Sequence, residues 1–217
     1  MDPKLSEQFF VRDTKGKDNG VLIDLTYRCP IECPRCQRQE FFRNHGEQVW
    51  GGDLPLDTIE KAIDRFKAIT FGGQLSDPIH HPKFIEILKM CYHKGTVTNI
   101  ATASSGKPKS WFIYEAFAAN PNATWKFGID GLPEESHKYR VNQDGQKLFD
   151  IMCEAKHCLN TAPVWQYIVF KYNEKHIERA KFMAKVKGIT FRVRHSHRWR
   201  GDDDPYMPSE KYRMKAE

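Results

Sequence analysis

Several features that would assign a sequence to a class at once are absent from this chain of 217 residues. No run of about eighteen apolar residues occurs, the length that a membrane-spanning helix requires. The N-terminal stretch MDPKLSEQFF lacks the basic flank and apolar segment of a secretory signal peptide. Neither an internal repeat nor a low-complexity segment stands out. We therefore expect a cytoplasmic globular protein that does not engage a membrane.

A strong excess of charge is also lacking. Lys and Arg number 34 against 28 Asp and Glu, which gives a formal net charge of +6. This mild basic bias is compatible with an anionic or nucleic-acid partner but does not require one. Much of it lies in residues 191–200, FRVRHSHRWR, which contain four arginines and no acid. This segment predicts either a partner-binding surface or a strand with a solvated basic face.

What is present is an alternation of short apolar runs with longer amphipathic ones, in a chain that is 40% hydrophobic. Strands that alternate with helices pair in parallel, with the helices outside. Six such units form an open sheet or a partial barrel, and the chain is short for a full eight-unit barrel. We expect strands over 20–26, 68–71, 96–102, 125–129, 164–170 and 189–195, and helices over 56–67, 82–94, 108–120, 146–159 and 174–187.

The six cysteines do not form the evenly spread framework of a disulfide-stabilised domain. Cys29, Cys33 and Cys36 instead cluster with the spacing C-x3-C-x2-C. A loop of this length wraps three thiolates around an iron–sulfur cube. Three ligands leave one of the four irons open to a small chelating molecule. The ends of parallel strands converge on one face, so this loop should meet the turns that follow the later strands.

Two other interpretations of the cysteines stay open at this point. Cys33 and Cys36 alone resemble a thioredoxin-type redox pair, which has no use for Cys29. A structural zinc ion would need a fourth ligand, for which Cys91 and His93 are distant candidates. No second C-x2-C or H-x3-H pair supports zinc. The corresponding alternative function is a zinc- or cluster-stabilised nucleic-acid-binding module without turnover.

The order of a strand, C-x3-C-x2-C, a helix and a strand ending in Gly72-Gly73 resembles the radical S-adenosylmethionine (SAM) superfamily. The resemblance implies an α/β fold, a partial (β/α)6 TIM-like barrel of parallel strands with outer helices. It implies that Cys29, Cys33 and Cys36 hold a [4Fe–4S] cluster, whose open iron is chelated by SAM. An electron from the cluster then cleaves SAM to a 5′-deoxyadenosyl radical, which abstracts a hydrogen from the substrate.

The resemblance also implies a set of SAM contacts. Gly72, Gly73 and Gln74 correspond to a Gly-Gly-Glu segment that holds the SAM amino group. Gln74 accepts a hydrogen bond there without charge, so Asp77 is expected to supply the negative charge or to cap a helix. The segment FGIDGL around Asp130, with the downstream Tyr-Arg, resembles another SAM-binding segment. The remaining expected contacts are Arg140, suited to the SAM carboxylate, and Ser104, Gln166 and His195.

Other residues depart from the usual family pattern or point to one branch of it. Arg35 occupies a position that is often aromatic, and Gly128 replaces a serine. The stretch from Gly72 to Pro82 and the segment YIVFKYN resemble the peptide-modifying, SPASM-related branch, without its C-terminal extension.

The resemblance thus predicts an N-terminal extension (1–17), a radical SAM core (18–200) and a polar tail (201–217). The expected substrate is a peptide, a nucleotide or a modified base, and the expected electron donor is flavodoxin or ferredoxin. The sequence does not set the oligomeric state.

Overall fold

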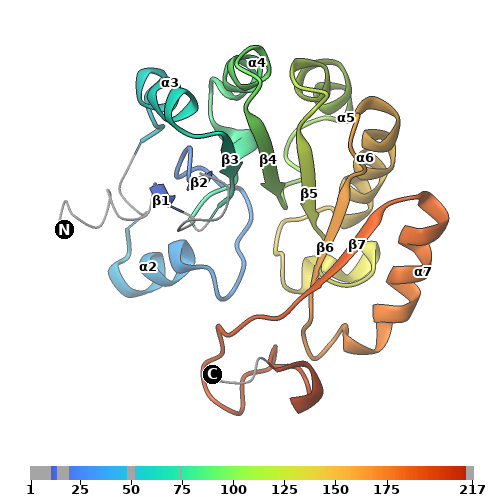
Figure 1. Ribbon diagram of the computed structural model, residues 1–217. Coiled ribbons are helices and arrows are strands. Elements are labelled where there is room, and N and C mark those ends of the chain that lie inside the picture. Colours follow the sequence, from blue (N-terminus) through green and yellow to red (C-terminus); the bar gives the residue numbers. More distant parts are fainter. Residues whose placement is uncertain (1–10, 14–19, 48–51, 74, 214–217) are drawn as a thin grey trace.

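The computed structural model describes residues 11–13, 20–47, 52–73 and 75–213 as one sheet covered by helices (Figure 1). The sheet has seven strands in the order β1 to β7. Strands β2 to β7 are all parallel, and β1 pairs antiparallel with β2 at one edge. Their bounds are β1 Val11–Asp13, β2 Gly20–Ile23, β3 Ala68–Phe71, β4 Val97–Thr102, β5 Thr124–Gly128, β6 Val164–Ile168 and β7 Thr190–Arg194. The six predicted parallel strands, and with them the α/β partial-barrel fold, are confirmed.

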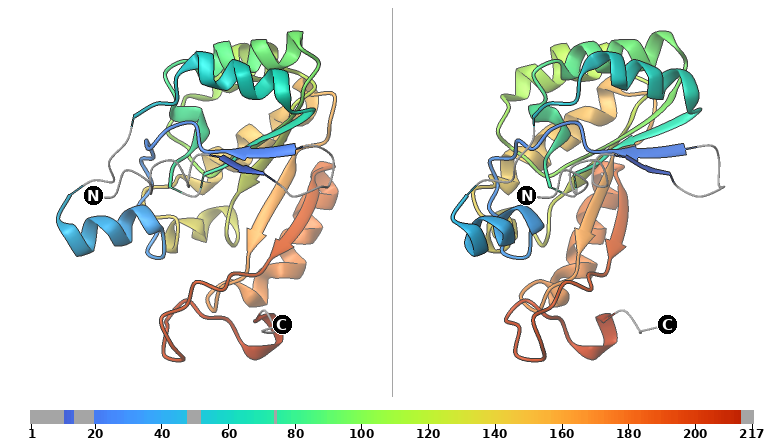
Figure 2. Two further views of the ribbon diagram at one scale, coloured as in Figure 1. Left: turned by 60° about the vertical axis from the view of Figure 1, so that its left-hand side comes forward. Right: turned by 90° about the vertical axis from the view of Figure 1, so that its left-hand side faces the viewer.

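Helices α3 to α7 lie along the outer face of the sheet, whereas α2 lies beyond the carboxyl ends of the strands (Figure 1, Figure 2). The helix bounds are α2 Gln37–His45, α3 Leu56–Arg65, α4 Phe84–His93, α5 Lys109–Trp111, α6 Gly145–Cys158 and α7 Ile177–Lys187. Helix α5 continues directly as a π-helix, Phe112–Phe117, so the predicted helix over 108–120 changes its hydrogen-bond pattern within its length. None of the described helices is long and apolar enough to cross a bilayer.

The two faces of the sheet differ in chemistry because side chains alternate along each strand. On β6, Trp165 and Tyr167 are fully buried against the helices, while Gln166 is only partly covered on the inner face. On β5, Phe127 is buried in the same outer layer. The core therefore lies between sheet and helices. The inner face is left free for polar side chains.

The strand predicted over 164–170 ends two residues early because its last backbone groups enter a turn held by Asn173. The side chain of Asn173 donates to the carbonyl oxygen of Ile168 (3.0 Å) and accepts from the N–H of Phe170 (2.8 Å). The backbone N–H of Phe170 is thus paired with Asn173 and not with a neighbouring strand. The turn directs the chain toward the carboxyl-end face of the sheet.

Two fully buried tryptophans give a matched test of the packing. Trp165 Nε1 donates to the carbonyl oxygen of Ile129 (2.8 Å), whereas Trp125 Nε1 has no hydrogen-bond partner among the described residues. We expect Trp165→Phe to lower the free energy of unfolding by about 1 kcal/mol more than Trp125→Phe, because only the first leaves a buried carbonyl unpaired. Urea unfolding measures both variants. Equal losses of unfolding free energy in the two variants would contradict the hydrogen bond assigned to Trp165.

Candidate functional site

The cysteine loop joins the end of β2 to the start of α2. The N–H of Cys36 donates to the carbonyl oxygen of Cys33 (3.0 Å), and the carbonyl of Cys36 accepts from Glu40 in the first turn of α2 (2.9 Å). Cys29, Cys33 and Cys36 are free thiols. Burial raises the pKa of Cys29 to about 12 and also raises the pKa of Cys33. A bound cationic centre would favour their thiolate forms, because metal ligation deprotonates a thiol.

Other segments hold this loop in place. The N–H of Glu32 donates to the carbonyl oxygen of Val141 (3.0 Å), in the loop before α6. The N–H of Asp77, in the loop after β3, donates to the carbonyl oxygen of Arg28 (3.0 Å). Because these partners follow β3 and β5, the cysteine loop is fixed relative to the carboxyl ends of the sheet.

The segment that follows β7 also reaches the cysteine loop. Arg35 forms an ion pair with Asp204 (2.8 Å), whose side chain is fully buried, and lies over the ring of Tyr206. Burial opposes the charge of Asp204. The N–H groups of Tyr206 and Arg200 and the guanidinium of Arg35 nevertheless hold the pKa of this carboxyl below its usual range. Arg35 thus tethers the cysteine loop to residues 200–207.

A cavity of about 310 Å³ lies where these segments meet the carboxyl ends of the strands. It brings together most of the predicted site residues, namely Cys29, Cys33, Cys36, Gly73, Asp77, Arg140, Gln166 and His195. Gly72, Ser104 and Asp130 do not line it, and Gln74 lies outside the described residues. The predicted convergence of loops is therefore present for every described strand end from β2 to β7.

The arrangement of the three thiols suits a four-iron cluster. Among the described residues, no three His, Cys, Asp or Glu side chains converge as ligands of a single metal ion. Structural zinc takes four ligands on one ion, whereas a four-iron cluster takes each thiolate on a different iron and so needs only the three cysteines of this loop. Cys91, a candidate fourth ligand for zinc, is buried in the hydrophobic core on α4. The residues present fit a cluster held by the loop alone.

Gly73 is required where the loop after β3 passes close to itself. A Cβ atom on Gly73 would overlap the backbone carbonyl of Ser76. A Cβ on the adjacent Gly72 would lie at ordinary contact distance, 3.7 Å, from the side chain of Leu22. The second glycine therefore shapes the turn that borders the cavity, and the first is tolerant.

Asp77 ties the loops after β3 and β4 together. Its buried carboxylate accepts from the hydroxyl of Thr102 (2.9 Å) and from the N–H groups of Ala103 (2.8 Å) and Ser104 (2.9 Å). It also accepts from Ile79 at the start of a short 3-10 helix, Pro78–His80. Ser104 is engaged as well, because its hydroxyl pairs with the ring Nε2 of His80 (2.8 Å).

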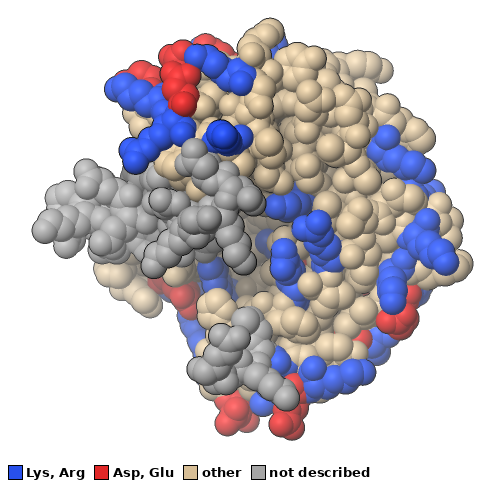
Figure 3. Space-filling view, in the orientation of Figure 1, with Lys and Arg blue, Asp and Glu red and all other residues tan. Residues whose placement is uncertain are grey.

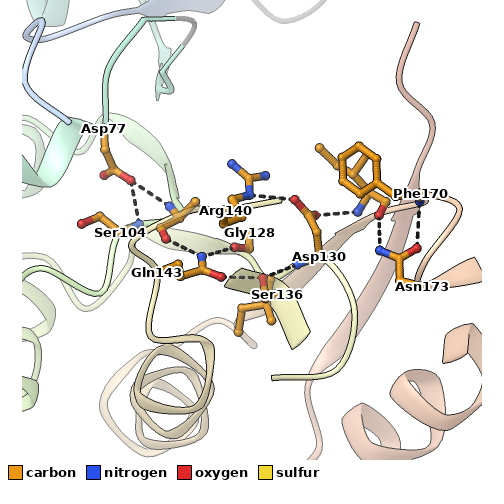
Figure 4. A network of polar contacts seen from close by, with 12 residues as sticks. Asp77, Ser104, Gly128, Asp130, Ser136, Arg140, Gln143, Phe170 and Asn173 are labelled. Carbon is orange, nitrogen blue, oxygen red and sulfur yellow. Dashed lines mark hydrogen bonds and ion pairs between the residues drawn. The ribbon is translucent and has the colours of Figure 1, made fainter. Parts of the chain in front are cut away.

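Asp130 orients Arg140 (Figure 4), whose guanidinium also interacts with Cys33. One carboxylate oxygen of Asp130 pairs with Nε of Arg140 (2.7 Å), and the other accepts from the N–H of Ile168 on β6 (2.8 Å). Burial opposes the charge of Arg140, but Asp130 and Cys33 raise its pKa, so the guanidinium stays charged. A Cβ on Gly128 would lie 3.2 Å from Nη2 of Arg140 and 3.2 Å from the Cβ of Ala103, so a larger residue here would press on both side chains.

Gln143 links the same network across two strand ends, and sequence reasoning missed it (Figure 4). Its Nε2 donates to the carbonyl oxygens of Ala103 (2.5 Å) and Gly128 (2.9 Å). Its Oε1 accepts from the hydroxyl of Ser136, which in turn accepts from the N–H of Asp130 (2.8 Å). All of these groups are buried, so each bond satisfies a polar atom that water does not reach. The only sequence signal for the role of Gln143 is its position three residues after Arg140.

The two glycines provide a matched pair of variants. We expect Gly73→Ala to destabilise the fold by about 2–3 kcal/mol, because the added methyl group displaces the backbone at Ser76. Gly72→Ala should change stability by less than about 1 kcal/mol. Thermal unfolding of both proteins checks this, and similar melting temperatures would refute the close approach.

The Arg35–Asp204 tether predicts a pH dependence. Because folding lowers the pKa of Asp204, its contribution is complete above the unfolded-state pKa and is lost as pH falls through the folded value. Asp204→Asn should cost about 1–3 kcal/mol near pH 7. The difference between wild type and variant should stay constant above about pH 5 and shrink below about pH 4. Chemical unfolding at several pH values measures it. A difference that does not change with pH would contradict the tether.

Comparison with known sequences gives one partial match. No protein-family model matches the chain. A PqqA peptide cyclase from Methylorubrum extorquens (strain AM1) is 31% identical over 91 residues, which is 40% of this chain and 22% of that protein. The PqqA peptide cyclase from Bradyrhizobium diazoefficiens is 25% identical over 100 residues, or 46% of this chain and 26% of that protein. The match therefore spans about a quarter of the length of these relatives.

Solved structures share the fold at low sequence identity. SuiB from Streptococcus suis gives a TM-score of 0.62 at 13% identity, over 90% of this chain and 41% of that one. The protein anSMEcpe with bound AdoMet and the Kp18Cys peptide also gives 0.62, at 14% identity, over 90% and 55%. Methylornithine synthase (PylB) gives 0.59 at 14% identity, over 89% and 55%. The chain is thus similar in part of its sequence to the PqqA peptide cyclases, and it shares the partial-barrel fold of these solved structures.

Proposed function

We propose that this chain is a radical SAM enzyme that binds one [4Fe–4S] cluster through Cys29, Cys33 and Cys36 and modifies a peptide. The observation that carries the proposal is a single cavity lined by all three free thiols and by the guanidinium of Arg140. Three thiolates leave one iron of a four-iron cluster without a protein ligand. A charged arginine beside that position suits a second, carboxylate-bearing ligand such as SAM.

Arg140 is the residue proposed to hold the SAM carboxylate. Its Nε is engaged by Asp130, which fixes the orientation of the guanidinium, and the guanidinium interacts with the thiol of Cys33. Asp130 and Gln143 do not touch the cavity and are positioning residues. Gly73 lets the backbone after β3 border the proposed SAM site closely, and Gln74 stays the expected partner of the SAM amino group. Asp77 instead caps the 3-10 helix Pro78–His80 and holds the loop after β4, so its carboxylate is not free for SAM.

Part of the cavity wall is apolar. Ile31, Leu75, Tyr139 and Phe170 line it, and the rings of Tyr139 and Phe170 stack with their centroids 4.0 Å apart. When bound, a reduced cluster supplies the electron that cleaves SAM to a 5′-deoxyadenosyl radical. An apolar wall keeps such a reactive species from solvent. Gln166 and His195, farther along the same cavity, are proposed to contact the nucleoside part of SAM.

A peptide substrate is supported by the names of the relatives. The curated relatives are PqqA peptide cyclases, and anSMEcpe was solved with a bound peptide. The inner face of the sheet, which the helices do not cover, provides room for a substrate beside the cysteines. We expect an electron donor such as flavodoxin or ferredoxin to reduce the cluster, in a reducing compartment such as the cytoplasm.

Anaerobic reconstitution with iron and sulfide tests this proposal. The protein should become brown and, after reduction, should release 5′-deoxyadenosine from SAM. Cys36→Ala should lose the four-iron absorbance and reduce 5′-deoxyadenosine formation at least about 100-fold, because one of three cluster ligands is gone. The matched control is Cys158→Ala, a partly buried thiol on α6 that should leave both signals unchanged. A colourless wild-type protein that binds zinc and nucleic acid would instead support the nucleic-acid-binding alternative.

A further inference from the structure

The inner face of the sheet carries a group of cations that the proposed SAM chemistry does not use. Lys126 extends from β5, and Arg192 and Arg194 extend from β7. No Asp or Glu occurs in β5, β6 or β7, whose sequences are TWKFG, VWQYI and TFRVR. We call Lys126, Arg192 and Arg194 the basic patch. Lys and Arg side chains gather over these strands beside the central hollow of the molecule (Figure 3).

Strand register makes the basic patch continuous with the cysteine cavity. Gln166 on β6 pairs with Gly128 on one side and with Arg192 on the other. Lys126 lies two residues before Gly128, on the same face of β5. Lys126 and Gln166 both line the cavity that contains Cys33 and Arg140. A group bound at the basic patch would therefore lie against the same space as the proposed SAM site.

The basic patch has no internal counter-charge among the described residues. Arg35 and Arg140 each form an ion pair with a buried carboxylate, at 2.8 Å and 2.7 Å, but no ion pair is formed by Lys126, Arg192 or Arg194. Lys126 is partly buried, and burial together with the charges of Arg192 and Arg194 lowers its pKa. Placing three cations together costs free energy, which an incoming anion would offset.

Protection of the sheet edge does not account for the whole patch. Charged side chains on an edge strand prevent pairing with another chain, and this explains Arg192 and Arg194 on β7. Lys126 lies on β5, two strands inside the edge, where no such protection is needed. Lys126 is partly buried and is repelled by Arg192 and Arg194, so a bound anion would stabilise its charged form.

We propose that the basic patch binds an acidic side chain of the substrate peptide and so selects peptides with a carboxylate near the modified residue. This inference rests on the proposed function. Nucleic acid is disfavoured because none of the inward-facing positions of β5 to β7, which include Lys126, Gln166 and Arg192, carries an aromatic ring to stack on a base. The rings of Tyr139 and Phe170, which line the same cavity, stack on each other with their centroids 4.0 Å apart. Successive side chains of an extended peptide point in different directions, so one of them can reach the basic patch while its neighbour lies elsewhere in the cavity. The guanidinium groups of Arg192 and Arg194 bind carboxylates well.

Fluorescence anisotropy with defined probes tests the proposal without turnover. The probes are a labelled ten-residue peptide of alternating Glu and Gly, the same peptide with Gln for Glu, and a single-stranded RNA of ten nucleotides. At low salt, the full-length protein should bind the Glu peptide at least about tenfold more tightly than the Gln peptide. It should also bind the Glu peptide more tightly than the RNA.

The matched variants remove equal charge from different faces. Lys126→Met/Arg192→Gln should weaken Glu-peptide binding at least about tenfold. Arg179→Gln/Lys185→Gln, two exposed positions on α7, should change it less than about twofold. Arg194→Gln, also exposed, provides a second patch variant should the first fail to fold. Thermal unfolding verifies each fold.

Equal effects of the two double variants, or equal binding of the Glu and Gln peptides, would overturn the proposal. Tighter binding of RNA that depends on the basic patch would overturn it in favour of a nucleic-acid substrate. Release of 5′-deoxyadenosine from SAM is measured separately. Equal binding of the Glu and Gln peptides by a wild-type protein that cleaves SAM refutes only the role of the patch, whereas absence of SAM cleavage refutes the proposed function.

Discussion

The site depends on one constraint, the need to satisfy buried polar groups where parallel strands end. Near Ala103, Gly128 and Asp130 the hydrogen bonds between neighbouring strands come to an end, and the buried backbone groups there need other partners. Gln143 joins the first two of these strand ends, and Asp130 joins β5 to β6 through Ile168. The same carboxylate holds Arg140 beside Cys33. The bonds that close the ends of the sheet therefore also set the geometry of the proposed SAM site.

Stability and function are separated on the two faces of the sheet. The outer face buries large rings such as Trp125, Phe127 and Trp165 against the helices, and this burial supplies most of the favourable free energy. The inner face carries Lys126 and Gln166, which contribute little to the core. A polar inner face is tolerated because the outer layer holds the fold, so the inner residues are free to meet SAM and substrate.

Much of the fold and part of the candidate site could be predicted from the sequence. Alternating apolar and amphipathic runs predict the six parallel strands, because the hydrophobic period is a local property and strands that alternate with helices pair in parallel. The spacing of Cys29, Cys33 and Cys36 is local too. The role of Gln143 and the Arg35–Asp204 tether were not predictable, because they join residues far apart in the chain through contacts that no periodicity encodes. Asp77 was expected near SAM, but its hydrogen bonds to Thr102, Ala103 and Ser104 appear only in three dimensions.

The central claim is that the cavity beside Cys33 and Arg140 brings SAM onto an open iron of the cluster. Electron–nuclear double resonance of the reduced, reconstituted protein with SAM labelled with oxygen-17 in its carboxylate tests this claim most directly. The account predicts hyperfine coupling between the label and the cluster in the wild-type protein. A fully assembled four-iron cluster that binds SAM without any coupling to the labelled carboxylate would contradict it.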